Sequence, residues 1–246
     1  MRATASRGTA RHAGADGTAA VPRWLTVEEM TRLSPLPPGY RYAALESADV
    51  PGLVDFLGQW FPGIAVGAGS CFRRSSFYRR HVQLADDPSS MGRSFLVMLI
   101  RHGDELVGAF AAQRDLDTLS LYGRVGAIAG PHRNRGLTEA VLGLSEVLAR
   151  GMGLEIVFGL ATLHVPFMQQ ALESFGFRLA GITPGVDREM VEPGVVKRVF
   201  EALYVKVLVD EADMHLPDPA NLTPGTLALF SALYGAPGRA ARAAGG

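Results

Sequence analysis

The spacing of apolar residues along the chain alternates between a helical and an extended period, which predicts a mixed α/β fold. Apolar residues three or four positions apart predict helices at 50–57 and 137–148. Segments 75–85 and 165–176 are typical of two more helices. Extended apolar runs predict strands at 40–47, 94–115 (a hairpin turning at His102–Glu105), 119–130, 154–163, 177–183 and 195–209.

These elements form one predicted domain over residues 39–209, within the usual size of a single domain. Residues 1–38 are expected to be a flexible tail and a lead-in with a short helix, which Thr26 and Glu29 begin as a capping box. Residues 184–194 are expected to be a polar loop. Residues 210–246 are a C-terminal extension with a short helix around 222–233 and a frayed end. That helix could cover a sheet edge, the substrate cleft or a partner subunit in a homodimer.

Composition narrows the possible partners. Lys plus Arg equals Asp plus Glu at 24 each, so the overall charge favours neither nucleic acid nor an anionic membrane. Cys71 is the only cysteine, which excludes an internal disulfide and a multi-cysteine zinc site, and we expect no metal. No apolar run is long enough to span a bilayer. The arginine-rich opening loosely resembles a transit peptide, but we favour a disordered tail and a cytoplasmic protein.

The strongest chemical signal is the turn that opens the helix at 137–148, Arg133-Asn134-Arg135-Gly136-Leu137-Thr138. A helix N-terminus presents unpaired N–H groups to an anion, Gly136 permits a close backbone approach, and two arginines add positive charge. Glu139 would repel a phosphate placed beside it. Taken alone, the six residues are more typical of an exposed basic turn than of a phosphate site.

The surroundings of this turn change that interpretation. A strand with Gly123 and Gly126, prone to a bulge, leads into it, and a helix ending in Gly176-Phe177 follows. Together these segments resemble the GNAT superfamily of acyl-CoA N-acyltransferases over about residues 39–209. The family signature Arg/Gln-x-x-Gly-x-Gly/Ala is matched by Arg133, Gly136 and Thr138, although Thr138 departs from the small residue expected there.

The resemblance implies a splayed mixed β-sheet flanked by helices and an N-acetyltransferase that uses acetyl-CoA. It implies that the strand through Ile128 and Ala129 bonds the pantetheine arm and that the amides of Arg133–Thr138 hold the pyrophosphate. The amine would attack the thioester directly, and a backbone N–H near the end of the same strand would stabilise the developing oxyanion.

The usual catalytic residues of the family are missing. Leu172 stands where a tyrosine often serves as the acid, and Val165 replaces an asparagine. We rank His164 first as a substitute, because an imidazole can accept a proton near neutral pH. Glu201 is second, since burial of its strand face would raise its pKa. Tyr204 is third and should lie on the opposite face. For the first two a structural role is the simpler interpretation: a cap or packing residue for His164 and a salt-bridged edge residue for Glu201.

Two charged patches point to different acceptors. An arginine-rich helix, with Arg73, Arg74, Arg79 and Arg80, could recognise an acidic group, although a solvated face is the simpler interpretation and single-stranded nucleic acid a weaker one. Asp187, Glu189 and Glu192 would instead attract a small-molecule or peptide amine. Ser70 and Cys71 are interpreted as loop residues. The alternatives to N-acetyl transfer are a non-catalytic acyl-CoA-binding module, O-acyl transfer, and transfer of a longer acyl chain.

Overall fold

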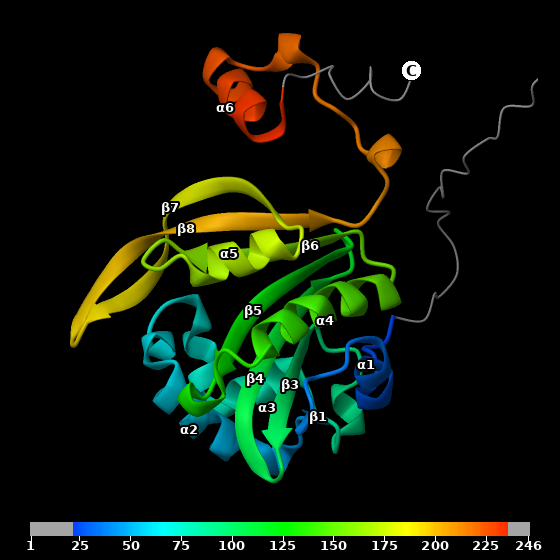
Figure 1. Ribbon diagram of the computed structural model, residues 1–246, viewed down its shortest axis with the longest axis vertical. Helices are drawn as coiled ribbons and strands as arrows, with labels where there is room; N and C mark the ends of the chain where they lie inside the picture. The colour runs from blue at the N-terminus through cyan, green and yellow to red at the C-terminus, as the bar shows by residue number, and fades with distance from the viewer. Residues whose placement is uncertain (1–21, 236–246) are drawn as a thin grey trace, which may run out of the picture.

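A single mixed sheet runs through the computed structural model, which describes residues 22–235 (Figure 1). Its strand order is β1-β3-β4-β5-β6-β8-β7, and the short β2 pairs with β3. Pairing is antiparallel except for β2 with β3 and β5 with β6. The strands are β1 Tyr40–Ala44, β2 Val82–Gln83, β3 Phe95–His102, β4 Glu105–Asp115, β5 Ser120–Ile128, β6 Ile156–Thr162, β7 Arg178–Glu192 and β8 Val195–Val207.

Helices cover both faces of the sheet and enclose two apolar cores. The first core joins the sheet to α1, α4 and α5, and contains Leu144 and Leu148 of α4, both fully buried as the helical spacing predicts. The second joins the other face to α2 and α3, and contains Leu53 and Leu57. The helices are α1 Val27–Leu33, α2 Val50–Trp60, α3 Ser75–His81, α4 Leu137–Gly151, α5 Phe167–Ser174 and α6 Pro224–Tyr234.

The sheet opens between β5 and β6. These strands pair only where Ser120–Tyr122 meets Ile156–Phe158, after which they diverge. On its other edge β5 stays paired with β4, where the Ala129 N–H donates to Val107 O at 2.8 Å. Because backbone groups alternate in direction along an antiparallel strand, those of Gly126 and Ile128 point away from β4 into the opening. The mixed, splayed and helix-flanked sheet expected from the sequence is confirmed.

A β-bulge lies at the start of this opening. Ala112 pairs with Gly123 and Ala111 with Val125, so Arg124 is an extra residue on β5 with no counterpart on β4. A bulge turns a side chain away from its regular direction and adds local twist. The bulge that the glycines of this strand predict is therefore present, and it carries an arginine.

The polar loop predicted at 184–194 is wrong. β7 continues to Glu192 and pairs with β8 almost to the turn at Pro193-Gly194, with register shifts between Thr183 and Asp187 and near Met190. Pro184 and the run of charges suggested a loop. However, exposure alternates residue by residue along β7, so this stretch is a strand exposed on one side.

The helices near the two ends of the described chain differ in burial: α1 has a buried residue, and α6 has none. Both halves of the capping box on α1 are present, because Glu29 N donates to Thr26 and Thr26 N donates to Glu29. The helix predicted in the C-terminal extension is α6, which has no buried residue and lies apart from the sheet in Figure 1. The predicted tails at 1–20 and beyond 235 lie outside the described residues. Between residues 22 and 235, no helix has the length and apolar character needed to cross a membrane.

Candidate functional site

A groove of about 230 Å³ occupies the opening between β5 and β6. Backbone from β5 forms one edge, and side chains of α4 and α5 form the other. Apolar atoms dominate its wall, which suits a flexible chain with few charges. The lining residues are Trp60, Phe61, Ile100, Ala109, Gly126, Ala127, Ile128, Arg133, Thr138, Val141, Leu142 and Met168.

The N-terminus of α4 opens at the same place. Gly136 is its N-cap in the left-handed conformation (φ 78°), and no side chain caps the helix. Asn134 is also left-handed (φ 57°), so the backbone reverses twice within the turn. The first N–H groups of α4, from Leu137 to Glu139, therefore lack helical partners and carry the positive end of a 15-residue helix dipole.

Arg133 joins this turn to the groove. Its Nε donates to Ile128 O at 3.1 Å and its Nη2 to Trp60 O at 3.4 Å. Ile128 lines the groove. Ala129 does not, because its N–H is bonded to Val107 and its carbonyl accepts from the N–H of His132. Asn134 and Arg135 are exposed, and Leu137 is buried in the first core.

A buried carboxylate lies on β8, the strand that follows β6 on the far side of the opening. Glu201 on β8 is 9% exposed and pairs with Thr162, the last residue of β6. Its Oε2 is one of three buried side-chain polar atoms in the described part of the chain without a hydrogen-bond partner, and the only carboxylate oxygen among them. Burial raises the pKa of Glu201, and nearby Asp187 and Glu189 raise it further. This carboxyl is therefore suited to take up a proton.

Asp187 and Glu189 on β7 complete what we call the carboxylate cluster with Glu201. The Asp187 Oδ1 accepts from the Ala68 N–H at 2.8 Å and from its neighbour's N–H, which fixes its orientation. The Glu189 Oε2 lies 4.0 Å from Nε2 of His164, which is half-exposed in the loop after β6. His164 therefore belongs to the rim of the cluster, whereas Glu201 lies inside it.

Arg124 faces the carboxylate cluster from the bulge on β5. Its positive charge lowers the pKa of Glu201 against the larger raising effects, and acts on Cys71 as well. Burial raises the pKa of the Cys71 thiol, whose Sγ donates to Ala68 O at 3.5 Å. The sequence did not single out Arg124. An arginine in an apolar strand next to a bulge-forming glycine was the available signal.

Two candidate positions lie on the other side of the sheet. Tyr204 is buried in the first core and donates to Glu173 Oε1 of α5 at 2.7 Å, and burial with this contact raises its pKa to about 12. Leu172 is also buried there. Tyr204 is thus separated from Glu201 by the sheet, as strand alternation predicts, and Leu172 offers no proton.

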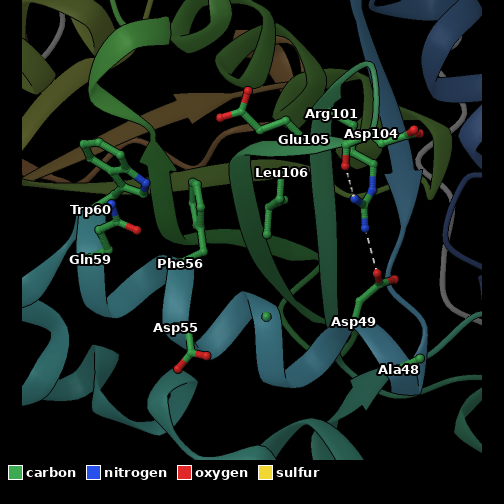
Figure 2. A pocket seen from close by; sticks show the side chains of 11 residues that line it. Ala48, Asp49, Asp55, Phe56, Gln59, Trp60, Arg101, Asp104, Glu105 and Leu106 are labelled. Atoms are coloured by element: carbon green, nitrogen blue, oxygen red, sulfur yellow. Dashed lines mark hydrogen bonds and ion pairs between the residues drawn. The ribbon is translucent and has the colours of Figure 1, made fainter.

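The larger cavity, of about 520 Å³, lies elsewhere, between α2 and the β3–β4 turn (Figure 2). It shares only Trp60 with the groove. Its arginine, Arg101, is already bonded to Asp49 Oδ1 at 2.7 Å and to Asp104 O at 2.8 Å. In the described part of the chain, no buried side-chain polar atom without a partner belongs to its lining.

The arginine-rich segment is not assembled into a site. Arg73 packs against α2, where its guanidinium fills the space above Gly58. Arg79 and Arg80 are exposed on α3, and Arg74 lies near Cys71. Within residues 22–235, no group of three His, Cys, Asp or Glu side chains is arranged to hold a metal ion.

Comparison with known proteins gives a match in fold. No protein-family model and no curated protein matches the chain in sequence. The solved structures that match it include the ribosomal-protein-S18-alanine N-acetyltransferase of Escherichia coli, Arabidopsis thaliana NAA60 in complex with a bisubstrate analogue, and yncA of Salmonella typhimurium with its cofactor acetyl-CoA.

The similarity extends over nearly all of each relative. Identities are 13%, 15% and 14%, and TM-scores 0.53, 0.52 and 0.50, in the same order. The matches cover 72%, 68% and 74% of this chain and 99%, 97% and 99% of the others. The chain therefore has the fold of the GNAT N-acetyltransferases, as its turn and Gly-Phe helix suggest.

Proposed function

We propose that this protein is an acyl-CoA-dependent N-acyltransferase that transfers an acetyl group from acetyl-CoA to an amine. The observation that carries the proposal is the combination of an uncapped helix N-terminus and an apolar groove on the β5 side of the opening with a buried carboxylate on β8, the strand beyond β6. The helix N-terminus suits the phosphates of the donor, and the groove suits its pantetheine arm. The carboxylate suits the proton that the reaction releases.

The residues present fit the acyl donor. The free N–H groups at the start of α4, with Arg133 and Arg135 beside them, would hold the pyrophosphate. The backbone of Gly126 and Ile128, which faces the groove, would bond the amides of the pantetheine arm. Bound acetyl-CoA supplies the thioester carbonyl that an amine attacks.

Groups of the protein would then accept the proton that the amine releases and stabilise the negative charge that develops on the thioester carbonyl. Glu201 takes a proton from the ammonium of the acceptor, and we place it ahead of His164 because Glu201 is buried whereas His164 is half-exposed. The amine nitrogen forms the C–N bond as the C–S bond breaks, and the products are the amide, the thiol and a proton. Backbone N–H groups of β5 that face the opening stabilise negative charge on the carbonyl oxygen.

A titration and a turnover assay test the proposal together. We expect acetyl-CoA to bind with a Kd of about 1 μM to 1 mM, the range in which the KM values of enzymes usually lie. We expect thiol release that depends on an added amine, with mass spectrometry showing an acetylated product. No heat of binding at millimolar acetyl-CoA would contradict the proposal.

The alternative of a non-catalytic acyl-CoA-binding module is favoured by one observation, the burial of Leu172 at the position of the family's tyrosine. This module would bind acetyl-CoA normally but release no thiol with any amine. Steady turnover with a single amine is enough to exclude it.

Reversing the charge of Arg133 is expected to weaken acetyl-CoA binding roughly tenfold, about 1.4 kcal/mol. The substitution Arg133→Glu removes positive charge beside the α4 N-terminus and places a carboxylate near the anion. Arg79→Glu makes the same change in net charge on the exposed side of α3 and serves as the control. Equal affinity in the two variants, measured by calorimetry at fixed salt, would remove Arg133 from the site.

A further inference from the structure

The carboxylate cluster has more negative charge than a single amine requires. Asp187, Glu189 and Glu201 come together on one face of β7 and β8, with Arg124 opposite them. Glu201 keeps a buried oxygen without a partner, and its neighbours raise its pKa. A group of like charges around an unsatisfied buried carboxylate is stabilised when a cation binds.

The pairing register of β7 with β8 determines the order of the three carboxylates along the hairpin. Asp187 pairs with Val199, which is two residues from Glu201 on β8 and therefore on the same face. Two residues of a strand span about 7 Å. Glu189 pairs with Lys197, two residues farther along, so the Lys197 cation lies on the same face and offsets the charge of Glu189, whereas Asp187 pairs with the uncharged Val199. The carboxylates thus form a row that leads from Glu201 toward the tip of the hairpin.

On the opposite side of Glu201 the same face becomes apolar. Leu203 follows Glu201 by two residues and pairs with Leu160, which is 44% exposed. Next to them Phe158 stacks on Tyr122 with ring centroids 4.8 Å apart. A second positive charge on an acceptor held at Glu201 is therefore attracted toward Asp187.

The arrangement of Asp187 leaves it able to bind such a charge. Its Oδ1 is held by two backbone N–H groups, while Oδ2 accepts no hydrogen bond from the described residues. The Ala68 N–H fixes the Asp187 carboxylate against the loop after α2. The carboxylate therefore loses little conformational entropy when a ligand binds.

We propose that the acceptor is an alkyl amine with a second positive charge, in which one nitrogen is acylated beside Glu201 while the other cationic group binds Asp187. The spacer between the two charges is about five carbons, comparable with two extended strand residues. This inference rests on the proposed function. The second charge could belong to a free diamine or to a basic peptide that presents its lysine.

A matched series of five-carbon amines tests the inference with the full chain and acetyl-CoA. We expect kcat/KM for 1,5-diaminopentane to exceed that for pentylamine at least tenfold, and 5-aminopentanoate, which carries a carboxylate instead, to be the poorest substrate. Lysinamide, whose α- and ε-nitrogens are separated by five carbons, distinguishes a peptide that begins with lysine from the free diamine. Equal values for the diamine and pentylamine, or a preference for 5-aminopentanoate, would overturn the inference.

A pair of variants assigns the effect to Asp187. In Asp187→Asn we expect the ratio of kcat/KM for 1,5-diaminopentane to kcat/KM for pentylamine to fall about tenfold. In Glu192→Gln, which removes one charge from the exposed end of the same strand, the ratio should stay as in the wild type. A ratio unchanged in Asp187→Asn would overturn the role of this residue.

Calorimetry separates this inference from the proposed function. Titration of 1,5-diaminopentane into the protein saturated with CoA measures acceptor binding without turnover. Diamine binding that Asp187→Asn weakens supports the cation site even if no thiol is released, a result that would contradict only the transferase. Absence of diamine binding in a protein that turns over pentylamine contradicts only the cation site.

Discussion

Glu201→Gln should lower kcat/KM for the acceptor by about 10²- to 10⁴-fold, the usual contribution of a general base. Glutamine keeps the size and polarity of the side chain but cannot take a proton from the ammonium. Glu201 does not line the groove, so the affinity for acetyl-CoA should stay within about twofold of the wild type. Thiol release at saturating acetyl-CoA measures kcat/KM for the acceptor, and calorimetry measures the affinity for acetyl-CoA.

The pH profile distinguishes loss of a base from loss of structure. The pKa of Glu201 is raised, so the carboxylate form and the activity should increase with pH through a value above the ordinary range of glutamate. Glu201→Gln should lack this acidic limb. Asp187→Asn removes a charge that raises the pKa of Glu201. The acidic limb of this variant's activity profile should therefore move to lower pH. An unchanged acidic limb in Glu201→Gln would assign the base to another group.

Gly126→Val should reduce acetyl-CoA affinity at least about 100-fold, close to 2.7 kcal/mol. Gly126 lines the groove, and its backbone faces the opening between β5 and β6. No atom lies within 4 Å of a Cβ built there and its φ is not positive, so the free protein can accept a β-branched residue that strands favour. The new methyl groups then fill space that the pantetheine arm needs.

A graded series of substitutions makes this result specific. Gly126→Ala should have a smaller effect than Gly126→Val, because less of the groove is filled. Gly123→Ala on the same strand, outside the groove lining, would meet only Phe158 O at 3.7 Å and serves as the control. Thermal unfolding of all three should match the wild type. Wild-type affinity in a folded Gly126→Val would place the donor outside this groove.

Local signals in the sequence predicted most of the fold. The apolar spacing of α4, the capping box of α1 and the glycines of β5 depend on residues close in the chain, and each is found where it was expected. β7 was missed at 184–192 because Pro184 and the charged residues are typical of a loop. Val186, Asp187 and Arg188 show no apolar alternation, and this stretch becomes a strand because β8 lies beside it.

The candidate site was less predictable, because pairing between distant strands assembles it. Glu201 was singled out for its strand face, but its rank against His164 depends on burial that only the packed sheet provides. Asp187 and Glu189 approach Glu201 through the register of β7 with β8. Arg124 reaches them because a bulge redirects it. None of these contacts follows from spacing along the chain.

The burial of Glu201 also has a cost for folding. A carboxyl whose pKa is higher in the native state than in the unfolded chain holds its proton more tightly when folded. As pH rises from the ordinary pKa of glutamate through the raised value, the free energy of unfolding therefore decreases. The pH at which Glu201 can act as a base is the pH at which it destabilises the native protein, and Gln at this position would relieve that destabilisation.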